Sequence, residues 1–567
     1  MKKTVILYAV TILTTVSMAL SCSLKEQSYT SVDKNEYLRD ADQAETLLLG
    51  LYQSMCTDGI YRYNLSMLLT LPTDEGKVEG STTVGTREQA SNAYTSTDSY
   101  VQNTWASLYS AIYEANDFLE AVSGRMDSFS EADAKRCEYY IAEAHALRAL
   151  YYFELVRWFG NVPLIKETAE SYKLPTEFKQ ADPVDVYKYI EEDLTAAAEV
   201  LPWYSDDNVR SDTSFRLSRG SVLGLLAKVY ATWAGYPLKD ESKWALAAEA
   251  AGKVVKSGKH SLIPDYEQLW KNAANNVWAP EESLIEASFY APQPNSASSG
   301  RVGKWNGVSA ANGSIRGNYN IALYKVHPTF LASWEKHSDD LRWALSFADY
   351  KYTATGKTAI TTANINGVST WITFDMAMDN TLEGWKADWR KNFSYQITPA
   401  KWDIEKYVDD ANQVADNNLS NVNWYVLRYA DVLLLYAEAL NEANGGPTSE
   451  AYLAVNAVRR RGFGVDTDKY SAKADIKYGQ SQEEFRETII RERSYELAFE
   501  GHRRQDLVRW GIYYDRVIQT YMDSQDWHEL APQYFIGATY TVKGKNELLP
   551  IPLHDIDLSG FVQNPKW

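Results

Sequence analysis

One long apolar helix near residue 150 constrains the fold of this chain more than any other segment. Over residues 141–164 the apolar side chains recur at helical spacing, and the pattern ends at Gly160 with Pro163 just beyond it. Four alanines leave parts of the helix surface small enough for neighbouring helices to approach closely, and large aromatic rings gather near its end. A helix of this kind is expected in the centre of a helical stack.

Further segments with helical periodicity fall into pairs. In the segment 218–233 Leu226, Ala227 and Tyr230 stand where the first helix of a tetratricopeptide repeat carries large, small and aromatic residues, and Tyr436-Ala437 repeats that pattern. The sequence therefore predicts a mainly α fold, a tetratricopeptide-like helical repeat scaffold of about four pairs. The expected pairs are 41–52 with 105–122, 141–164 with 185–200, 218–233 with 243–256, and 428–442 with 450–461.

Two stretches lack this periodicity. Residues 68–99 are rich in Thr, Ser, Gly and Asn, and residues 261–423 combine the same residue types with many tryptophans. Long irregular segments inside compact domains are commonly functional, and aromatic rings on loops held by a rigid frame offer stacking platforms to flat apolar ligand faces. We expect a loop-rich insertion at 261–423 that contributes to ligand binding.

Composition narrows the classes of function. The chain carries 40 Tyr and 18 Trp, which suggests that some rings face a ligand rather than the core. Its net charge of -18 argues against nucleic acid as a partner, because nucleic acids bind basic surfaces. The seven histidines and three cysteines show no metal-ligand spacing or disulfide framework, so we expect no metal and no cofactor.

The N-terminus is typical of a secreted lipoprotein. Lys2 and Lys3 precede an apolar run, which ends at Ala19-Leu20-Ser21-Cys22. This predicts a signal peptide at 1–21, lipidation of Cys22 and a tether at 22–35, and therefore a folded part that is anchored to a membrane. An ordinary signal peptide followed by a chance cysteine is the alternative.

Five blocks of the sequence resemble elements of the SusD/RagB family, the surface nutrient-binding lipoproteins of Bacteroidetes-type bacteria, and they occur in family order. The DxR element of that family is also present, as Asp340 and Arg342. The blocks are residues 105–116 (WASLYSAIYEAN), 142–164, 428–441, 485–511 and 548–567 (LLPIPLHDIDLSGFVQNPKW).

The resemblance implies an N-terminal SusD-like helical region at 36–260 and a C-terminal one at 424–567. It also implies a role: family members sit as lids on a TonB-dependent (SusC-like) outer-membrane barrel and capture glycans, or sometimes peptides. We therefore expect a lipoprotein of the outer membrane, facing the cell exterior, that binds oligo- or polysaccharide and hands it to that transporter. Peptide capture and an all-helical glycan-cleaving enzyme are the alternatives.

The resemblance places the ligand face on the loop before residue 105 and on loops of the irregular region. A sugar offers hydroxyls to Asp, Asn or Arg and an apolar C–H face to an aromatic ring. The alternative for each aromatic is packing in the core; for Trp305, between Gly303 and Gly307, we predict weaker ligand binding on mutation to Ala without a change in thermal stability. The expected ligand residues are Asp74, Arg87, Tyr94, Tyr100, Tyr290, Trp305, Tyr319, Trp371, Trp385 and Trp389.

The block 486–511 is rich in charge. Glu492, Glu496 and Glu500 follow at i,i+4 spacing among arginines, which puts Glu500 within reach of Arg504. Two interpretations arise, an acid pair for glycoside hydrolysis and a structural ion network. Arginines hold carboxylates ionised, whereas a general acid needs a raised pKa, so we predict the network and no catalytic residue.

Overall fold

The structure is a computed structural model of the chain. It describes residues 37–80, 85–291, 298–311, 314, 319–334, 339–365, 367–374, 376, 396–414, 416, 418–526 and 535–567. Cys22, Trp385 and Trp389 lie outside these residues.

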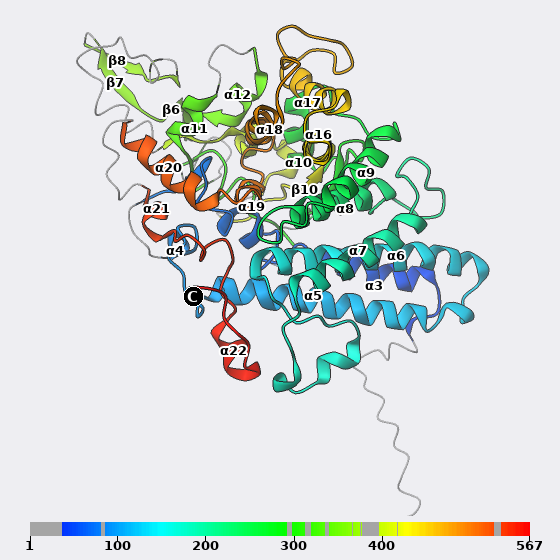
Figure 1. The fold of residues 1–567 in the computed structure, drawn as a ribbon. Coiled ribbons are helices and arrows are strands. Elements are labelled where there is room, and N and C mark those ends of the chain that lie inside the picture. Colours follow the sequence, from blue (N-terminus) through cyan, green and yellow to red (C-terminus); the bar gives the residue numbers. More distant parts are fainter. Residues whose placement is uncertain are drawn as a thin grey trace, which may run out of the picture.

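The described chain is mainly helical, as predicted, and its helices stack around α6 (Figure 1). α6 (Glu131–Phe159) begins at Ser130, whose side chain accepts a hydrogen bond from the Asp133 amide, and ends before Gly160, whose φ of +71° stops the helix. It packs against α3, α5 and α7. The other helices of the first half are α3 (Ala41–Ser54), α4 (Thr86–Gln89), α5 (Ser99–Ser123), α7 (Pro183–Val200), α8 (Arg219–Ala234), α9 (Lys243–Lys256) and α10 (Tyr266–Asn275).

The four predicted helix pairs are confirmed: α3 contacts α5, α6 contacts α7, α8 contacts α9, and α16 contacts α17. α16 also packs on α8, α9 and α18, which joins the two halves of the chain. The helices of the second half are α11 (Pro328–Ser333), α12 (Leu341–Ser346), α15 (Ile404–Tyr407), α16 (Tyr429–Asn444), α17 (Ser449–Gly462), α18 (Gln482–Glu496), α19 (Arg503–Arg509), α20 (Tyr513–Asp526), α21 (Ile536–Tyr540) and α22 (Leu553–Ser559).

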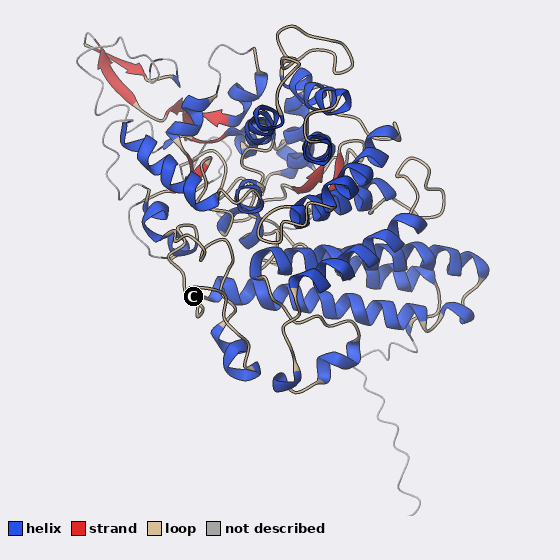
Figure 2. Ribbon diagram, in the orientation of Figure 1, coloured by secondary structure: helices blue, strands red, loops and turns tan. Residues whose placement is uncertain are grey.

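The described strands are short and form two-stranded antiparallel sheets, coloured red in Figure 2. The pairs are β1 with β3, β2 with β10, β4 with β9, β5 with β6, and β7 with β8. Their bounds are β1 (Gly76–Val78), β2 (Ser283–Ala287), β3 (Tyr324–Val326), β4 (Phe347–Ala348), β5 (Tyr350–Thr353), β6 (Gly356–Ala359), β7 (Thr362–Ile365), β8 (Val368–Trp371), β9 (Thr398–Pro399) and β10 (Trp424–Arg428).

A buried ion network connects the helices to the irregular region. Arg428 at the end of β10 pairs with Glu282 at 2.9 Å, with Glu496 at 3.1 Å and with Glu500 at 2.7 Å. All four side chains are at most 1% exposed. We call this set the Arg428 network; its members are Arg342, Arg428, Arg461, Lys401, Glu282, Glu492, Glu496 and Glu500.

The predicted ion network is confirmed, but the expected pair of Glu500 with Arg504 is wrong. α18 ends at Glu496, so Glu500 lies beyond the helix and pairs with Arg428 and Lys401 instead. Arg504 donates to the backbone carbonyls of Leu69 and Leu71, at 2.9 and 2.7 Å. The chain turns after Glu496, and this redirects both side chains.

Two further observations concern the described residues. Cys56 and Cys137 are buried and unpaired with each other. Within the described ranges, every helix is too short or too polar to cross a membrane.

Candidate functional site

Three separate segments meet around Tyr63, which follows the turns after α3. The Tyr63 ring makes edge contacts with Tyr100, at 6.2 Å between centroids, and with Trp305, at 5.7 Å. The guanidinium of Arg301 lies 4.7 Å from the centre of the same ring. The start of α5 and the irregular region thus both contact the ring of Tyr63.

Local structure fixes Tyr100 and Arg301 in this cluster. Asp98 caps α5 by accepting hydrogen bonds from the amides of Tyr100 and Val101, at 2.9 and 3.1 Å. This cap holds Tyr100, in the first turn of the helix, beside Tyr63. The segment carrying Arg301 is held by Gly300, whose backbone pairs with that of Ser420 at 2.8 and 2.9 Å. Both side chains therefore come from anchored backbone.

The charged groups of this cluster remain open to solvent. Arg301 pairs with Asp58 at 3.0 Å, and the two side chains are 33% and 40% exposed. Arg62 lies 3.3 Å from the same carboxylate. We call the surface that Asp58, Tyr100 and Arg301 form around the buried ring of Tyr63 the Tyr63 face.

The Tyr63 hydroxyl connects this face to α4. Burial raises the pKa of Tyr63, and a hydrogen bond with the side chain of Thr86 opposes that rise. Thr86 precedes Arg87, one of the predicted ligand residues, whose Nε donates to the Glu79 carbonyl at 2.6 Å. Arg87 and Tyr100 are both partly exposed, so their predicted contact with a ligand stays a prediction.

Asp74 and Tyr94 both contact the C-terminal part of the chain. Asp74 is held by Arg503 through two bonds of 2.7 and 2.8 Å; burial raises its pKa, but Arg503, Arg516 and a backbone hydrogen bond together outweigh burial, so the pKa falls below its usual value. Tyr94 is 1% exposed and stacks on Trp567 at 5.4 Å. Tyr94 is covered by the C-terminal part of the chain, so we correct its assignment to packing, whereas ligand binding by the partly exposed Asp74 stays a prediction.

Trp305 also belongs to the core. It is 5% exposed and lies between the rings of Tyr63 and Tyr324. The glycines beside it serve close packing rather than an open loop, because a Cβ at Gly307 would collide with the carbonyl oxygen of Trp402. We therefore correct the assignment of Trp305 from ligand platform to support for the Tyr63 ring.

The remaining predicted aromatics lie in the irregular region. Tyr290 and Trp371 are 49% and 47% exposed, and Tyr319 is partly exposed. Tyr290 is joined to the Tyr63 side of the molecule, because its neighbours Ser288 and Phe289 contact Cys56 and Gly300. Binding by these three residues stays a prediction, and Trp385 and Trp389 lie outside the described residues.

Sequence reasoning missed Asp58, Tyr63 and Arg301. The sequence signal was weak: residues 61–64 read Tyr-Arg-Tyr-Asn directly after a predicted helix, and all four are buried in the structure. Arg301 carried no local signal, since its partner Asp58 lies 243 residues away.

The carboxylates of the Arg428 network do not form an acid pair. Burial alone raises the pKa of Glu496, but Arg461, Arg428 and Arg342 lower it to about 2. Glu500 also has a lowered pKa, because Arg428 and Lys401 outweigh its burial. Carboxylates held ionised and closed off from solvent are unsuited to donate a proton to a glycosidic oxygen.

Comparison with protein-family models gives two matches that together cover most of the chain. Residues 304–567 match the model described as the SusD family. Residues 26–231 match a SusD-like model described as starch-binding and associating with the outer membrane.

Individual proteins give the same result. The SusD-like protein P2 of Formosa agariphila is 27% identical over 518 residues, which is 90% of this chain and 91% of that protein. The crystal structure of a SusD homolog from Bacteroides thetaiotaomicron is 48% identical, with a TM-score of 0.89 over 96% of this chain and 100% of the other. A laminarin-binding SusD-like protein, 23% identical, shares the fold with a TM-score of 0.64 over 93% of this chain and 100% of its own.

Proposed function

The chain belongs to the SusD family, and from this membership we propose that it is a cell-surface lipoprotein that captures an oligo- or polysaccharide and delivers it to a SusC-like, TonB-dependent outer-membrane transporter. The observation that carries the proposal is the Tyr63 face, where the partly exposed ring of Tyr100 stands near an accessible arginine–aspartate pair.

The chemistry of this face suits a sugar. The ring of Tyr100 offers an apolar surface to the C–H face of a pyranose, and Arg301 and Asp58 offer a donor and an acceptor to adjacent hydroxyls. Because both charged side chains are partly exposed, a ligand can displace water from them without leaving a buried charge unpaired. Binding without bond cleavage is what this arrangement performs.

Retention in polysaccharide gels tests the proposal. Soluble protein from residue 23 onward is run through native gels containing laminarin, xyloglucan or amylopectin, and the polymers are then sized. We expect retardation without shortening, and loss of retardation in Arg301→Ala. Arg491→Ala, which removes an exposed arginine from α18, is the matched control.

Other outcomes of this assay separate the alternatives. Shortened polymer revives the glycan-cleaving enzyme. Retardation by none of the polymers, together with binding of a peptide library, replaces the glycan by a peptide ligand.

Membrane attachment through Cys22 is part of the same proposal. It is supported by the signal-like N-terminus and by the outer-membrane description of the matching family model. Cys22→Ala is expected to move the protein from the membrane fraction to the soluble fraction of fractionated cells. Cys137→Ala, a change at a buried cysteine, should leave it in the membrane; retention of both variants there would reject lipidation of Cys22.

A further inference from the structure

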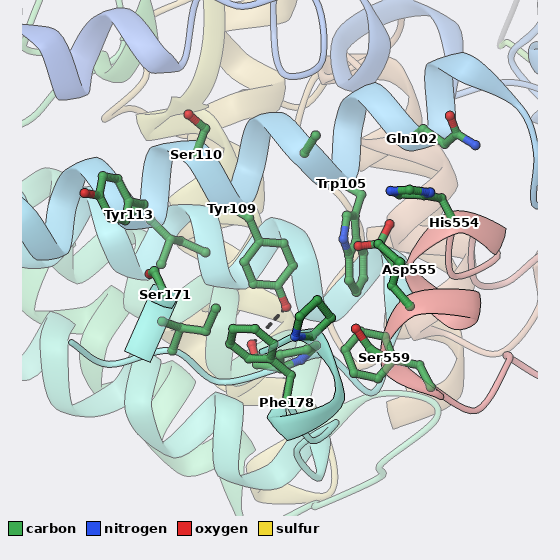
Figure 3. A pocket seen from close by; sticks show the side chains of 17 residues that line it. Gln102, Trp105, Tyr109, Ser110, Tyr113, Ser171, Phe178, His554, Asp555 and Ser559 are labelled. Carbon is green, nitrogen blue, oxygen red and sulfur yellow. Dashed lines mark hydrogen bonds between the residues drawn. The ribbon is translucent and has the colours of Figure 1, made fainter. Parts of the chain in front are cut away.

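A concave site lies on another side of α5, away from the Tyr63 face. It is a cleft of about 650 Å³ between α5, the segment 163–178 and the C-terminal segment that contains α22 (Figure 3). This volume is within the range of sites that hold small molecules, roughly 300–1,000 Å³.

Helix geometry separates the two sites. With 100° of rotation per residue, Tyr100 projects from one side of α5, whereas Trp105, Tyr109 and Tyr113 project from the opposite side. On the first side α5 packs closely on the turn after α3, where a Cβ at Gly59 would lie 2.6 Å from the Asn103 carbonyl oxygen. The cleft is on the second side.

The α5 wall of the cleft is an aromatic stripe. Trp105, Tyr109 and Tyr113 recur at i,i+4 spacing, so successive rings are about 6 Å apart along the helix axis. Tyr109 is fixed by its neighbours: its hydroxyl donates to the Pro163 carbonyl at 2.9 Å, and its ring lies 4.9 Å from that of Trp105. Figure 3 shows Phe178 across the cleft from α5, beyond the hydroxyl end of the Tyr109 side chain.

Polar groups surround this stripe. Gln102 and Ser110 come from α5, and His554, Asp555 and Ser559 come from α22. Burial raises the pKa of Asp555, while a hydrogen bond with the Trp105 side chain lowers it. The carboxylate therefore stands at the edge of an aromatic surface, as in the Tyr63 face, although the two sites share no residue.

We infer that this cleft is a second carbohydrate-binding site, which takes a pyranose unit of a glycan chain with its C–H face on Tyr109 and its hydroxyls on the polar rim. The inference rests on the proposed function for the class of ligand. A ring stripe with convergent donors and acceptors on opposing walls fits a sugar, which presents apolar and hydroxyl surfaces together. Two sites on one protein bind one polymer more tightly than either site alone.

Two cysteine variants block the sites one at a time. Ala106→Cys introduces a thiol at an exposed position of α5 that lines the cleft, and Asp58→Cys introduces one at a partly exposed position of the Tyr63 face. The native Cys56 and Cys137 are buried, so a bulky maleimide attaches at the new thiol. Circular dichroism checks that each labelled protein keeps its fold.

The readouts are calorimetric stoichiometry with heptasaccharides of laminarin, xyloglucan and amylopectin, and retardation by the corresponding polymers. The unlabelled protein should bind two heptasaccharides, and each label should remove one of them and weaken polymer binding by about 100-fold. Tyr113→Ala, without any label, should weaken the same site as the label at position 106.

The outcomes distinguish this inference from the proposed function. A stoichiometry that the label at position 106 leaves unchanged overturns the second site. If the label at position 58 then removes all binding, the Tyr63 face and the proposed function stand without the second site. Absence of binding by the unlabelled protein to all three glycans overturns both.

Discussion

Two arginines of this molecule, Arg428 and Arg301, meet carboxylates in opposite settings. Arg428 is fully buried and pairs with three glutamates, whereas Arg301 is one-third exposed and pairs with Asp58 on the surface. Every charge around Arg428 is engaged by another part of the chain, and its partners come from segments far apart in sequence. The pair at Arg301 has room to accept a ligand. The comparison shows that an arginine–carboxylate pair stabilises the fold where it is buried and is available to bind a ligand where it is exposed to solvent.

The largest effect is expected from breaking the buried cluster. Arg428→Ala leaves Glu496 and Glu500 with fewer cationic partners in a site closed to water, so unfolding should become easier by about 3–5 kcal/mol. Urea unfolding followed by fluorescence measures this. Arg491→Ala, on the exposed side of α18, should change stability by less than about 0.5 kcal/mol; equal effects of the two variants would contradict the comparison.

Two tryptophans of the irregular region test burial in the same way. Trp305→Ala removes a 5% exposed ring from between Tyr63 and Tyr324, so we expect a loss of about 3 kcal/mol, the reverse of the sequence-based expectation. Trp371→Ala removes a 47% exposed ring and should leave the melting temperature nearly unchanged. An unchanged melting temperature in Trp305→Ala would return this residue to the ligand face.

Acid should weaken the buried ion pairs of the protein. The pKa of Glu496 is lowered to about 2, and that of Asp506 is likewise lowered to about 2 by Arg493 and Arg509 against the effect of burial. A carboxylate whose folded pKa lies below its unfolded value stabilises the protein above the unfolded pKa and loses that contribution as the pH falls toward the folded one. Stability should therefore drop between about pH 4.5 and pH 2.

The measurement is the urea midpoint as a function of pH. Glu496→Gln has no carboxylate to protonate at this position. Between pH 4.5 and pH 2 the free energy of unfolding of this variant should therefore fall by roughly 2–3 kcal/mol less than that of the unmodified protein. The same slope in both proteins would mean that Glu496 is not held ionised.

The helical frame was predictable because its signals are local. The spacing of apolar residues and the stop at Gly160 identify α6 without knowledge of the rest of the chain, although the spacing alone misses its first ten residues, from Glu131 onward. The helix pairs follow from the same periodicity. The resemblance to the SusD/RagB family added their order and the expectation of a ligand face.

The ligand face was less predictable because burial depends on distant partners. Asp74 is engaged by Arg503, 429 residues away, and Tyr94 is covered by Trp567, so neither position looks different from an exposed loop residue in the sequence. Tyr100 contacts Tyr63 because an N-cap fixes its position at the start of α5, and its role in binding stays a prediction. Local signals thus locate the segments of the face, and only the folded structure decides which side chains remain free to bind.

The smallest expected effect, and the one that addresses recognition itself, comes from the Tyr63 face. Tyr100→Ala removes a partly exposed ring and should weaken glycan binding about tenfold, or about 1.4 kcal/mol, with the urea midpoint nearly unchanged. Calorimetry with a retained glycan measures the affinity. Tyr470→Ala, which removes a 75% exposed ring on the loop after α17, is the matched control and should change neither quantity. Weaker binding together with lower stability in Tyr100→Ala would mean that this ring, like Trp305, supports the face rather than touching the sugar. Weaker binding with unchanged stability would mean that Tyr100 contacts the sugar, whereas its neighbour Trp305 stabilises the fold.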